Sequence, residues 1–311
     1  MEGTRAAASA TPILDREEPL PPELRDRSWI VGLLVAGGIG GLGGLILALD
    51  RPAFVDEWFP PGSWLPELFE RSPLSFGLTL VAALGLAFLL QWGATLLAAR
   101  CAGLRTLATG TRIQRLASLV GSVSGGWGML PRRTDRLVLR IGLVLLAGPA
   151  ANLVLGGIVL LLLKGQGLEH YAWMSVIIGF VTLLPLPSRG RPSAGLLLWK
   201  LRDRAWAGRM RALLLLARES EEGVLPEDWS PRLLEEAVAV TDESPHTVVA
   251  HALAYSSAFY RGAPDPARFL ETCLRFSGTA GPAWRETLMS NAAVWQARQR
   301  GRADLAERWL A

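Results

Sequence analysis

Long apolar runs alternate with Arg-rich connections over the first two hundred residues of the chain. Four runs carry few or no charges and approach the roughly 20 apolar residues that a helix needs to cross a bilayer; they cover residues 29–49, 76–99, 137–163 and 171–186. The fourth run is short and ends at a proline-rich break. The apolar segment 194–201 that follows either completes the crossing or lies at the interface. This pattern predicts an all-α membrane core of about four spans over residues 29–200.

The hydrophobic pattern changes on both sides of that core. Residues 1–28 are polar and contain four prolines, which is typical of a disordered tail. Residues 205–311 show apolar positions at helical spacing opposite charged faces, which predicts a second, helical domain. Within it, Arg261-Gly262 recurs as Arg300-Gly301. We therefore expect helical hairpins similar to tetratricopeptide repeats, with a plain helical bundle as the alternative.

Arginine placement predicts how the core sits in the bilayer. Arg and Lys are frequent before the first run, between the second and third, and after the fourth, and they are scarce in the other two connections. Because cytoplasmic loops carry the excess of Lys and Arg, both termini should be cytoplasmic. The composition agrees, since 50% of residues are hydrophobic and 19% are charged, against about 25% in soluble domains. We expect an integral protein of a lipid bilayer, in a bacterial plasma membrane. The net charge is +4, and the basic residues lie beside the apolar runs, as membrane orientation requires. We therefore expect no binding to nucleic acid.

The second run ends in LLQWGATLLAARCAGL, residues 89–104. This segment resembles the site-2 proteases, intramembrane zinc metallopeptidases with H-E-x-x-H near the cytoplasmic end of a membrane helix and an Arg and a Gly downstream. The resemblance places Gln91 and Thr95 at the two His positions and Trp92 at the Glu position. Arg100 and Gly103 match the downstream part. In the family, the two His bind zinc and the Glu activates its water.

Two later segments extend this resemblance over roughly residues 75–200. The third run contains AGPAANL, similar to the family's G-P-x-x-N, with Gly148, Pro149 and Asn152 in place.

The fourth run leads into TLLPLPSRGRPSAG, similar to the family's N-L-L-P followed by a D-G pair. Pro185, Ser193 and Gly195 are retained there. Ala194 replaces the Asp that supplies the family's third zinc ligand; a looser frame puts Gly190 there instead, and neither is a carboxylate.

The sequence argues against a zinc site independently of that resemblance. Its three histidines are His170, His246 and His251, none of them in an apolar run, and runs two to four contain no Asp or Glu. A catalytic zinc needs three imidazole, carboxylate or thiolate ligands. We therefore expect no catalytic residues, no metal ligands and no cofactor, with zinc binding lost. His246 and His251 are five residues apart, which favours a surface or hairpin role over metal binding.

These observations favour a pseudo-protease that acts by binding, with a single-span membrane client or a soluble partner on residues 205–311. The first alternative is a structural scaffold membrane protein with a helical-repeat interaction domain, and the second is an atypical active intramembrane metallopeptidase. A solute carrier is disfavoured, because the runs contain no buried charge for coupling an ion.

Overall fold

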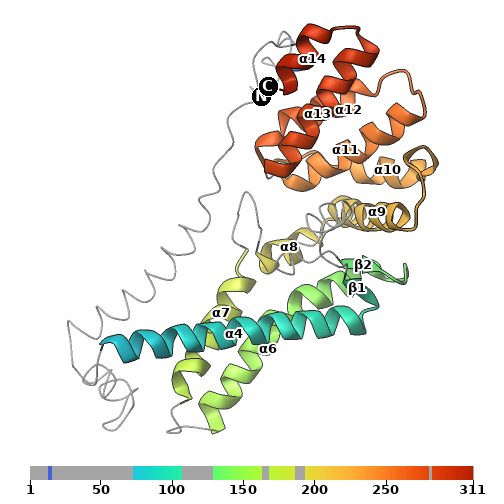
Figure 1. Cartoon of the computed structure of the whole chain (residues 1–311). Helices are drawn as coiled ribbons and strands as arrows, with labels where there is room; N and C mark the ends of the chain where they lie inside the picture. Colours follow the sequence, from blue (N-terminus) through green and yellow to red (C-terminus); the bar gives the residue numbers. More distant parts are fainter. Residues whose placement is uncertain are drawn as a thin grey trace, which may run out of the picture.

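The computed structural model describes residues 13–15, 73–106, 129–162, 168–185, 193–279 and 282–310. Ten α-helices account for most of these residues, so the all-α prediction is confirmed at the level of fold class (Figure 1). The first expected span, residues 29–49, lies outside the described residues, as do the proline-rich break at 186–192 and the loop at 107–128.

Two of the expected spans appear as helices long and apolar enough to cross a membrane. They lie within α4 (Pro73–Cys101) and α6 (Leu137–Leu162), and only 17% and 39% of their most apolar windows are buried. Such exposed apolar helices indicate association with a membrane, because the core helix of a soluble protein would be mostly buried. The third apolar helix, α7 (Glu169–Leu183), has 15 residues and is shorter than a typical span.

The three apolar helices pack against one another, with α6 in contact with both α4 and α7. At its C-terminal end α4 leads into a short antiparallel strand pair, β1 (Leu104–Thr106) and β2 (Met129–Pro131), in which Arg105 lies opposite Leu130. Gly103 makes this exit possible, since its φ of +71° is a left-handed conformation that favours glycine. The sequence did not predict these strands.

The helices after the proline-rich break form the second part of the fold. They are α8 (Ala194–Lys200), α9 (Arg204–Glu221), α10 (Pro231–Val238), α11 (Pro245–Tyr260), α12 (Ala267–Arg275), α13 (Pro282–Gln299) and α14 (Ala303–Leu310), with 3₁₀ turns at Pro226–Asp228 and Ser277–Thr279. The hairpins α11–α12 and α13–α14 turn at Gly262 and Gly301, whose φ angles are +65° and +64°. The recurring Arg-Gly pair therefore marks two helical hairpins, as predicted.

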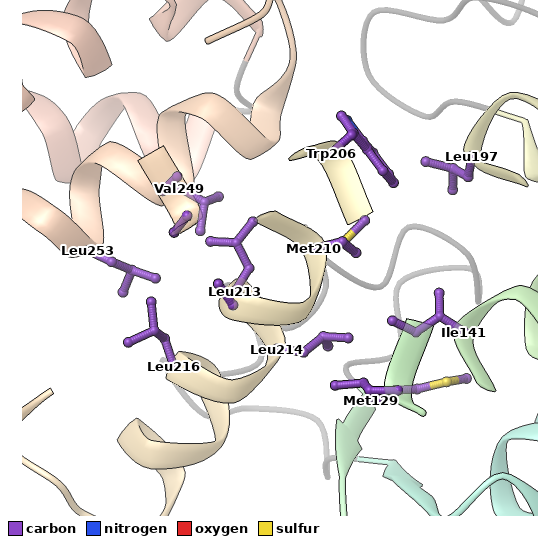
Figure 2. Packing of buried hydrophobic residues seen from close by; sticks show 14 of the residues in the cluster. Met129, Ile141, Leu197, Trp206, Met210, Leu213, Leu214, Leu216, Val249 and Leu253 are labelled. Atoms are coloured by element: carbon purple, nitrogen blue, oxygen red, sulfur yellow. The ribbon is translucent and has the colours of Figure 1, made fainter. Parts of the chain in front are cut away.

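A single hydrophobic cluster joins the two parts of the fold. We call it the junction cluster, and Figure 2 shows that it gathers side chains from β2, α6, α8, α9 and α11, among them Met129, Ile141, Leu197, Trp206, Met210, Leu213 and Val249. Leu213 and Val249 are fully buried and Leu197 is 1% exposed. The cytoplasmic domain expected from residue 205 onward is thus packed on the apolar helices.

A piece of the expected N-terminal tail also has a fixed place. Ile13–Asp15 forms one 3₁₀ turn, η1, that contacts α12, and the Leu14 side chain is 1% exposed. The expectation of a disordered tail does not hold for these three residues, because they bury an apolar side chain and bond their backbone to a distant helix. The rest of residues 1–28 lies outside the described residues.

Candidate functional site

The positions that resemble the zinc ligands belong to a polar cluster between α4, α6 and α7. Gln91 and Thr95 lie one turn apart on α4 and therefore share a face of that helix. The Thr95 hydroxyl donates to the Gln91 carbonyl oxygen at 2.8 Å, and the Thr95 residue is 6% exposed. Both side chains project toward α6, where Gly148 faces them.

A chain of hydrogen bonds links this face to the other two helices. Ser175 Oγ on α7 donates to Asn152 Oδ1 on α6, and Asn152 Nδ2 donates to Gln91 Oε1, each at 3.0 Å. Asn152 and Ser175 are both fully buried. Because polar groups between apolar helices need partners, this chain binds the three helices together. We call Gln91, Thr95, Asn152 and Ser175 the polar cluster.

Gly148 brings α6 close to the polar cluster. A Cβ atom on this residue would lie 2.5 Å from Thr95 Oγ1 and 2.8 Å from the Gln91 carbonyl oxygen. No side chain fits at such distances without moving the helices, so the G-P-x-x-N segment here serves close packing. Pro149 and Asn152 lie in the same buried stretch of α6.

The segment that resembles the family's third ligand closes the proline-rich break. Ser193 Oγ donates to the Leu184 carbonyl oxygen at 2.6 Å and accepts from Leu196 N at 3.1 Å, which caps the start of α8. A Cβ on Gly195 would lie 1.9 Å from the Leu183 carbonyl oxygen, so only glycine fits there. These retained positions dock the start of α8 on the end of α7.

The remaining motif residues do not join the polar cluster. Ala194 packs partly buried against the junction cluster, and Trp92 has 39% of its surface exposed. Arg100 is exposed in the last turn of α4, and Pro185 is exposed just after α7. The structure thus brings together Gln91 and Thr95 with Asn152, and leaves Trp92 and Ala194 outside that group.

The residues present do not fit a zinc ion. The Gln91 amide oxygen accepts from Asn152, the Thr95 hydroxyl donates to the backbone, and Ala194 offers a methyl group. Across the described residues, no group of three His, Cys, Asp or Glu side chains is placed to hold a metal. Neutral amide and hydroxyl groups are weak replacements for the imidazole and carboxylate ligands that zinc uses.

Comparisons with protein-family models, with curated proteins and with solved structures found no match to this chain. The resemblance to site-2 proteases therefore rests on the motifs described above.

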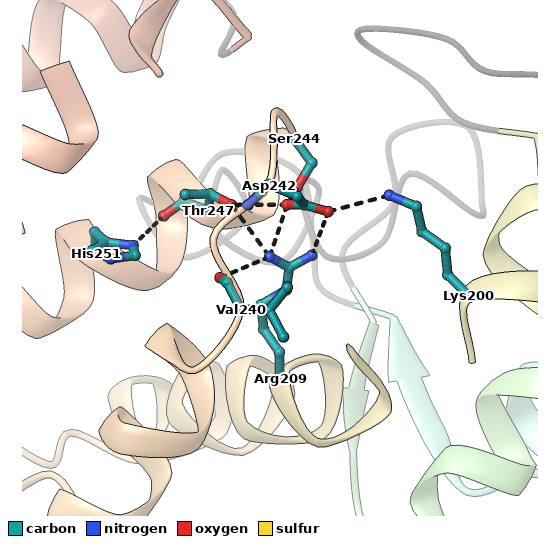
Figure 3. Close-up of polar contacts among 7 residues, drawn as sticks. All are labelled: Lys200, Arg209, Val240, Asp242, Ser244, Thr247 and His251. Carbon is teal, nitrogen blue, oxygen red and sulfur yellow. Dashed lines mark hydrogen bonds and ion pairs between the residues drawn. The ribbon is translucent and has the colours of Figure 1, made fainter. Parts of the chain in front are cut away.

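A second polar group, which the sequence did not reveal, lies where α8, α9 and α11 meet (Figure 3). Arg209 is 1% exposed on α9 and donates from Nη1 and Nη2 to the two carboxylate oxygens of Asp242, at 2.9 and 3.2 Å. Lys200 on α8 forms an ion pair with the same carboxylate at 3.2 Å. We call Lys200, Arg209 and Asp242 the charged junction.

Hydrogen bonds fix the charge state of this junction. Burial raises the pKa of the Asp242 carboxyl, but hydrogen bonds from Arg209, Ser244 and Thr247, together with the Arg209 charge, outweigh it and hold that pKa well below its usual range. Asp242 is therefore a carboxylate that holds Arg209 in place. One signal in the sequence could have revealed the charged junction, because Arg209 lies within the apolar stripe of α9, between Trp206 and Met210.

The two C-terminal histidines are buried next to the charged junction. His246 is 3% exposed and lies edge-on to Trp206, with ring centroids 5.7 Å apart. His251 is 7% exposed and its Nδ1 lies 2.9 Å from the Thr247 carbonyl oxygen. Burial, followed by the Arg209 charge, lowers the pKa of His246 to about 3, and burial lowers that of His251. Of the two expected roles, the surface position is wrong for both histidines, because their side chains are buried. The hairpin position is confirmed, since both lie on α11, the first helix of the α11–α12 hairpin.

Proposed function

We propose that this chain is a catalytically inactive membrane protein, similar to site-2 proteases, that works by binding partners. The observation that carries the proposal is the hydrogen-bond chain from Ser175 through Asn152 to Gln91. At the positions that the resemblance assigns to the metal ligands, the protein has neutral side chains within this hydrogen-bonded group. Neither a metal-bound water nor a carboxylate base is available from such groups.

The membrane part offers the partner an apolar surface. Leu89, Trp92 and Leu97 on α4 are between 39% and 64% exposed, on faces that the polar cluster does not use. A single-span client helix could pack along such a face beside the polar cluster. The soluble part offers a separate surface on α9 to α14 for a cytoplasmic partner.

A cytoplasmic position of both termini is part of the proposal. Arg placement along the sequence favours it. Contact between Ile13–Asp15 and α12 supports a common side for the two ends of the chain, because segments in contact lie on one side of a bilayer. That arrangement requires an even number of crossings between residue 15 and α9, which four spans satisfy.

The test is photo-crosslinking in native membranes from a crosslinkable residue at position 91 or 194. Both native residues are partly exposed, and both lie where the resemblance places the substrate site. Leu161, which is 75% exposed on α6, is the matched position for the lipid background. We expect positions 91 and 194 to capture defined single-span proteins that position 161 does not. Equal capture from all three positions would refute a client site.

A structural scaffold is the second candidate, favoured by the close packing at Gly148 and by the junction cluster that joins both parts. In a scaffold the polar cluster only holds helices together. An Asn152→Leu chain that is still folded would then pull down the same partners as the wild type from solubilised membranes. The client-binding proposal instead expects loss of membrane partners with soluble partners retained.

A further inference from the structure

The N-terminal turn η1 is held by side chains more than two hundred and fifty residues away along the chain. Glu271 on α12 accepts two consecutive backbone N–H groups through its two carboxylate oxygens, from Ile13 at 2.9 Å and from Leu14 at 2.8 Å. Gln296 Nε2 on α13 donates to the Leu14 carbonyl oxygen. Three main-chain groups of one short segment are therefore bonded by side chains from two helices.

The Leu14 side chain fills an apolar site between the same two helices. It is 1% exposed and belongs to a cluster with Leu270 and Cys273 of α12 and Leu288 and Ala292 of α13, all of them fully buried. An anchoring apolar side chain with its backbone held on both sides is how folded domains commonly bind short peptides.

Gln296 adds a polar contact to the backbone of η1 inside this apolar site. With η1 in place Gln296 is fully buried, and its Nε2 donates a hydrogen bond to the Leu14 carbonyl oxygen of η1. With η1 docked, this donor is paired inside an otherwise apolar site, where an unpaired donor would be costly. The amide oxygen Oε1 has no hydrogen-bond partner among the described residues, so the contact with η1 rests on the donor Nε2. A domain that only needed a packed core would place an apolar residue there.

We propose that α12 and α13 form a binding site for a short peptide anchored by leucine, and that Ile13–Asp15 is its intramolecular ligand. The ligand class is a peptide turn with an Ile-Leu pair whose two N–H groups are free to donate. A tethered segment has an effective concentration on the order of millimolar. A contact as small as three residues therefore stays closed within the chain, while a free peptide with the same motif competes for it. The proposal does not depend on the function proposed above.

The experiment uses the full chain in detergent and a fluorescent peptide with residues 8–20 of this sequence. In the wild type the site is occupied, whereas Leu14→Asp in the chain should vacate it, because a charge cannot enter the apolar site. We expect the Leu14→Asp chain to bind the peptide at least about tenfold more tightly than the wild type, as fluorescence anisotropy would show. The same peptide with Asp in place of Leu14 should not bind.

Glu271→Ala added to the Leu14→Asp chain should abolish peptide binding. Glu307→Ala is the matched control, because Glu307 is an exposed acid on α14, and it should leave binding unchanged. The proposal would be overturned if Glu271→Ala left peptide binding unchanged, or if the folded Leu14→Asp chain did not bind the peptide.

A second measurement needs no substitution. Excess free peptide should displace η1 in the wild-type chain and accelerate tryptic cleavage after Arg16, the residue that follows the docked turn. A cleavage rate that the peptide leaves unchanged would contradict an exchangeable intramolecular ligand, even if the variants did not fold.

Discussion

A fall in pH should destabilise the C-terminal part of this protein through its two buried histidines, because burial lowers the pKa of both His246 and His251. His246 lies 3% exposed against Trp206, and its Nε2 has no hydrogen-bond partner in the described residues. Burial and the charge of Arg209 lower its pKa to about 3, from an ordinary value of 6.5. The folded protein therefore keeps His246 neutral, while the unfolded chain takes up a proton as soon as the pH falls below 6.5.

The sign and size of the effect follow from this difference. A group whose pKa is lower in the folded state contributes stability that is complete above the unfolded pKa and is lost as the pH falls toward the folded pKa. Each pH unit in that window changes the free energy of unfolding by about 1.4 kcal/mol. Lowering the pH from about 7.5 to about 5 should therefore cost about 2 kcal/mol, or about thirtyfold in the unfolding equilibrium. Asp242 adds nothing in this range, since its carboxyl is ionised in both states above its ordinary pKa of 3.8.

Hydrogen–deuterium exchange of the full chain in detergent measures this locally. Protection of the slowest α11 amides, corrected for the pH dependence of intrinsic exchange, should fall at least about thirtyfold between these two pH values, with His251 adding to the loss from His246. His246→Phe keeps an aromatic ring beside Trp206 and removes one titrating group, so about thirtyfold of the pH dependence should disappear and the part due to His251 should remain. Equal protection at both pH values, or an undiminished loss in His246→Phe, would refute the reasoning.

Two further substitutions test the packing directly. Gly148→Ala should lower the free energy of unfolding by about 1–3 kcal/mol, because its Cβ would overlap Thr95 Oγ1, and thermal denaturation in detergent measures this. Gly157→Ala is the control on the same helix. Its Cβ meets nothing within 4 Å, so it should leave the thermal midpoint unchanged. Asp242→Asn should cost about 2–4 kcal/mol by thermal denaturation, since it leaves Arg209 buried without its counter-charge; this is below the cost for a fully buried pair, because the Asp242 side chain keeps 29% exposure. A Gly157→Ala chain as unstable as Gly148→Ala, or an Asp242→Asn chain as stable as the wild type, would contradict these contacts.

Hydrophobic runs and local turn signals were enough to predict part of this fold. The apolar runs predicted α4 and α6 nearly to their ends, because a helix apolar enough to cross a membrane carries its signal in composition alone. The Arg-Gly recurrence located the turns at Gly262 and Gly301, since a left-handed helix end favours glycine.

Contacts between distant segments could not be read in the same way. The strands β1 and β2 are three residues each, too short to show an alternating pattern. Arg209 pairs with Asp242 only once α9 and α11 are packed. The position of Arg209 in the apolar stripe of α9 does not identify its partner, and Asp242 looks like an ordinary surface charge in the sequence. The docking of Ile13-Leu14 was hidden by the polar, proline-containing segment around it, although an adjacent apolar pair in such a tail was a usable signal.

In the candidate site, the sequence placed Gln91 and Thr95 on one face but could not supply their partners. The G-P-x-x-N motif identified Asn152 in the sequence. Its hydrogen bond to Gln91 could not be predicted, because it forms only when α6 packs on α4. Ser175 belongs to no motif and joins the polar cluster only because α7 packs beside α6. Trp92 has 39% of its surface exposed, because a residue adjacent to Gln91 in the sequence lies on a different face of the helix.

The most direct test of the central claim is the zinc content of the purified full chain, measured by mass spectrometry after expression with zinc supplied. A polar cluster of neutral side chains that are hydrogen-bonded to one another predicts no more zinc in the wild type than in a folded Gln91→Leu/Thr95→Val chain. One zinc per wild-type chain that is lost in this variant would contradict the account and favour an atypical active metallopeptidase.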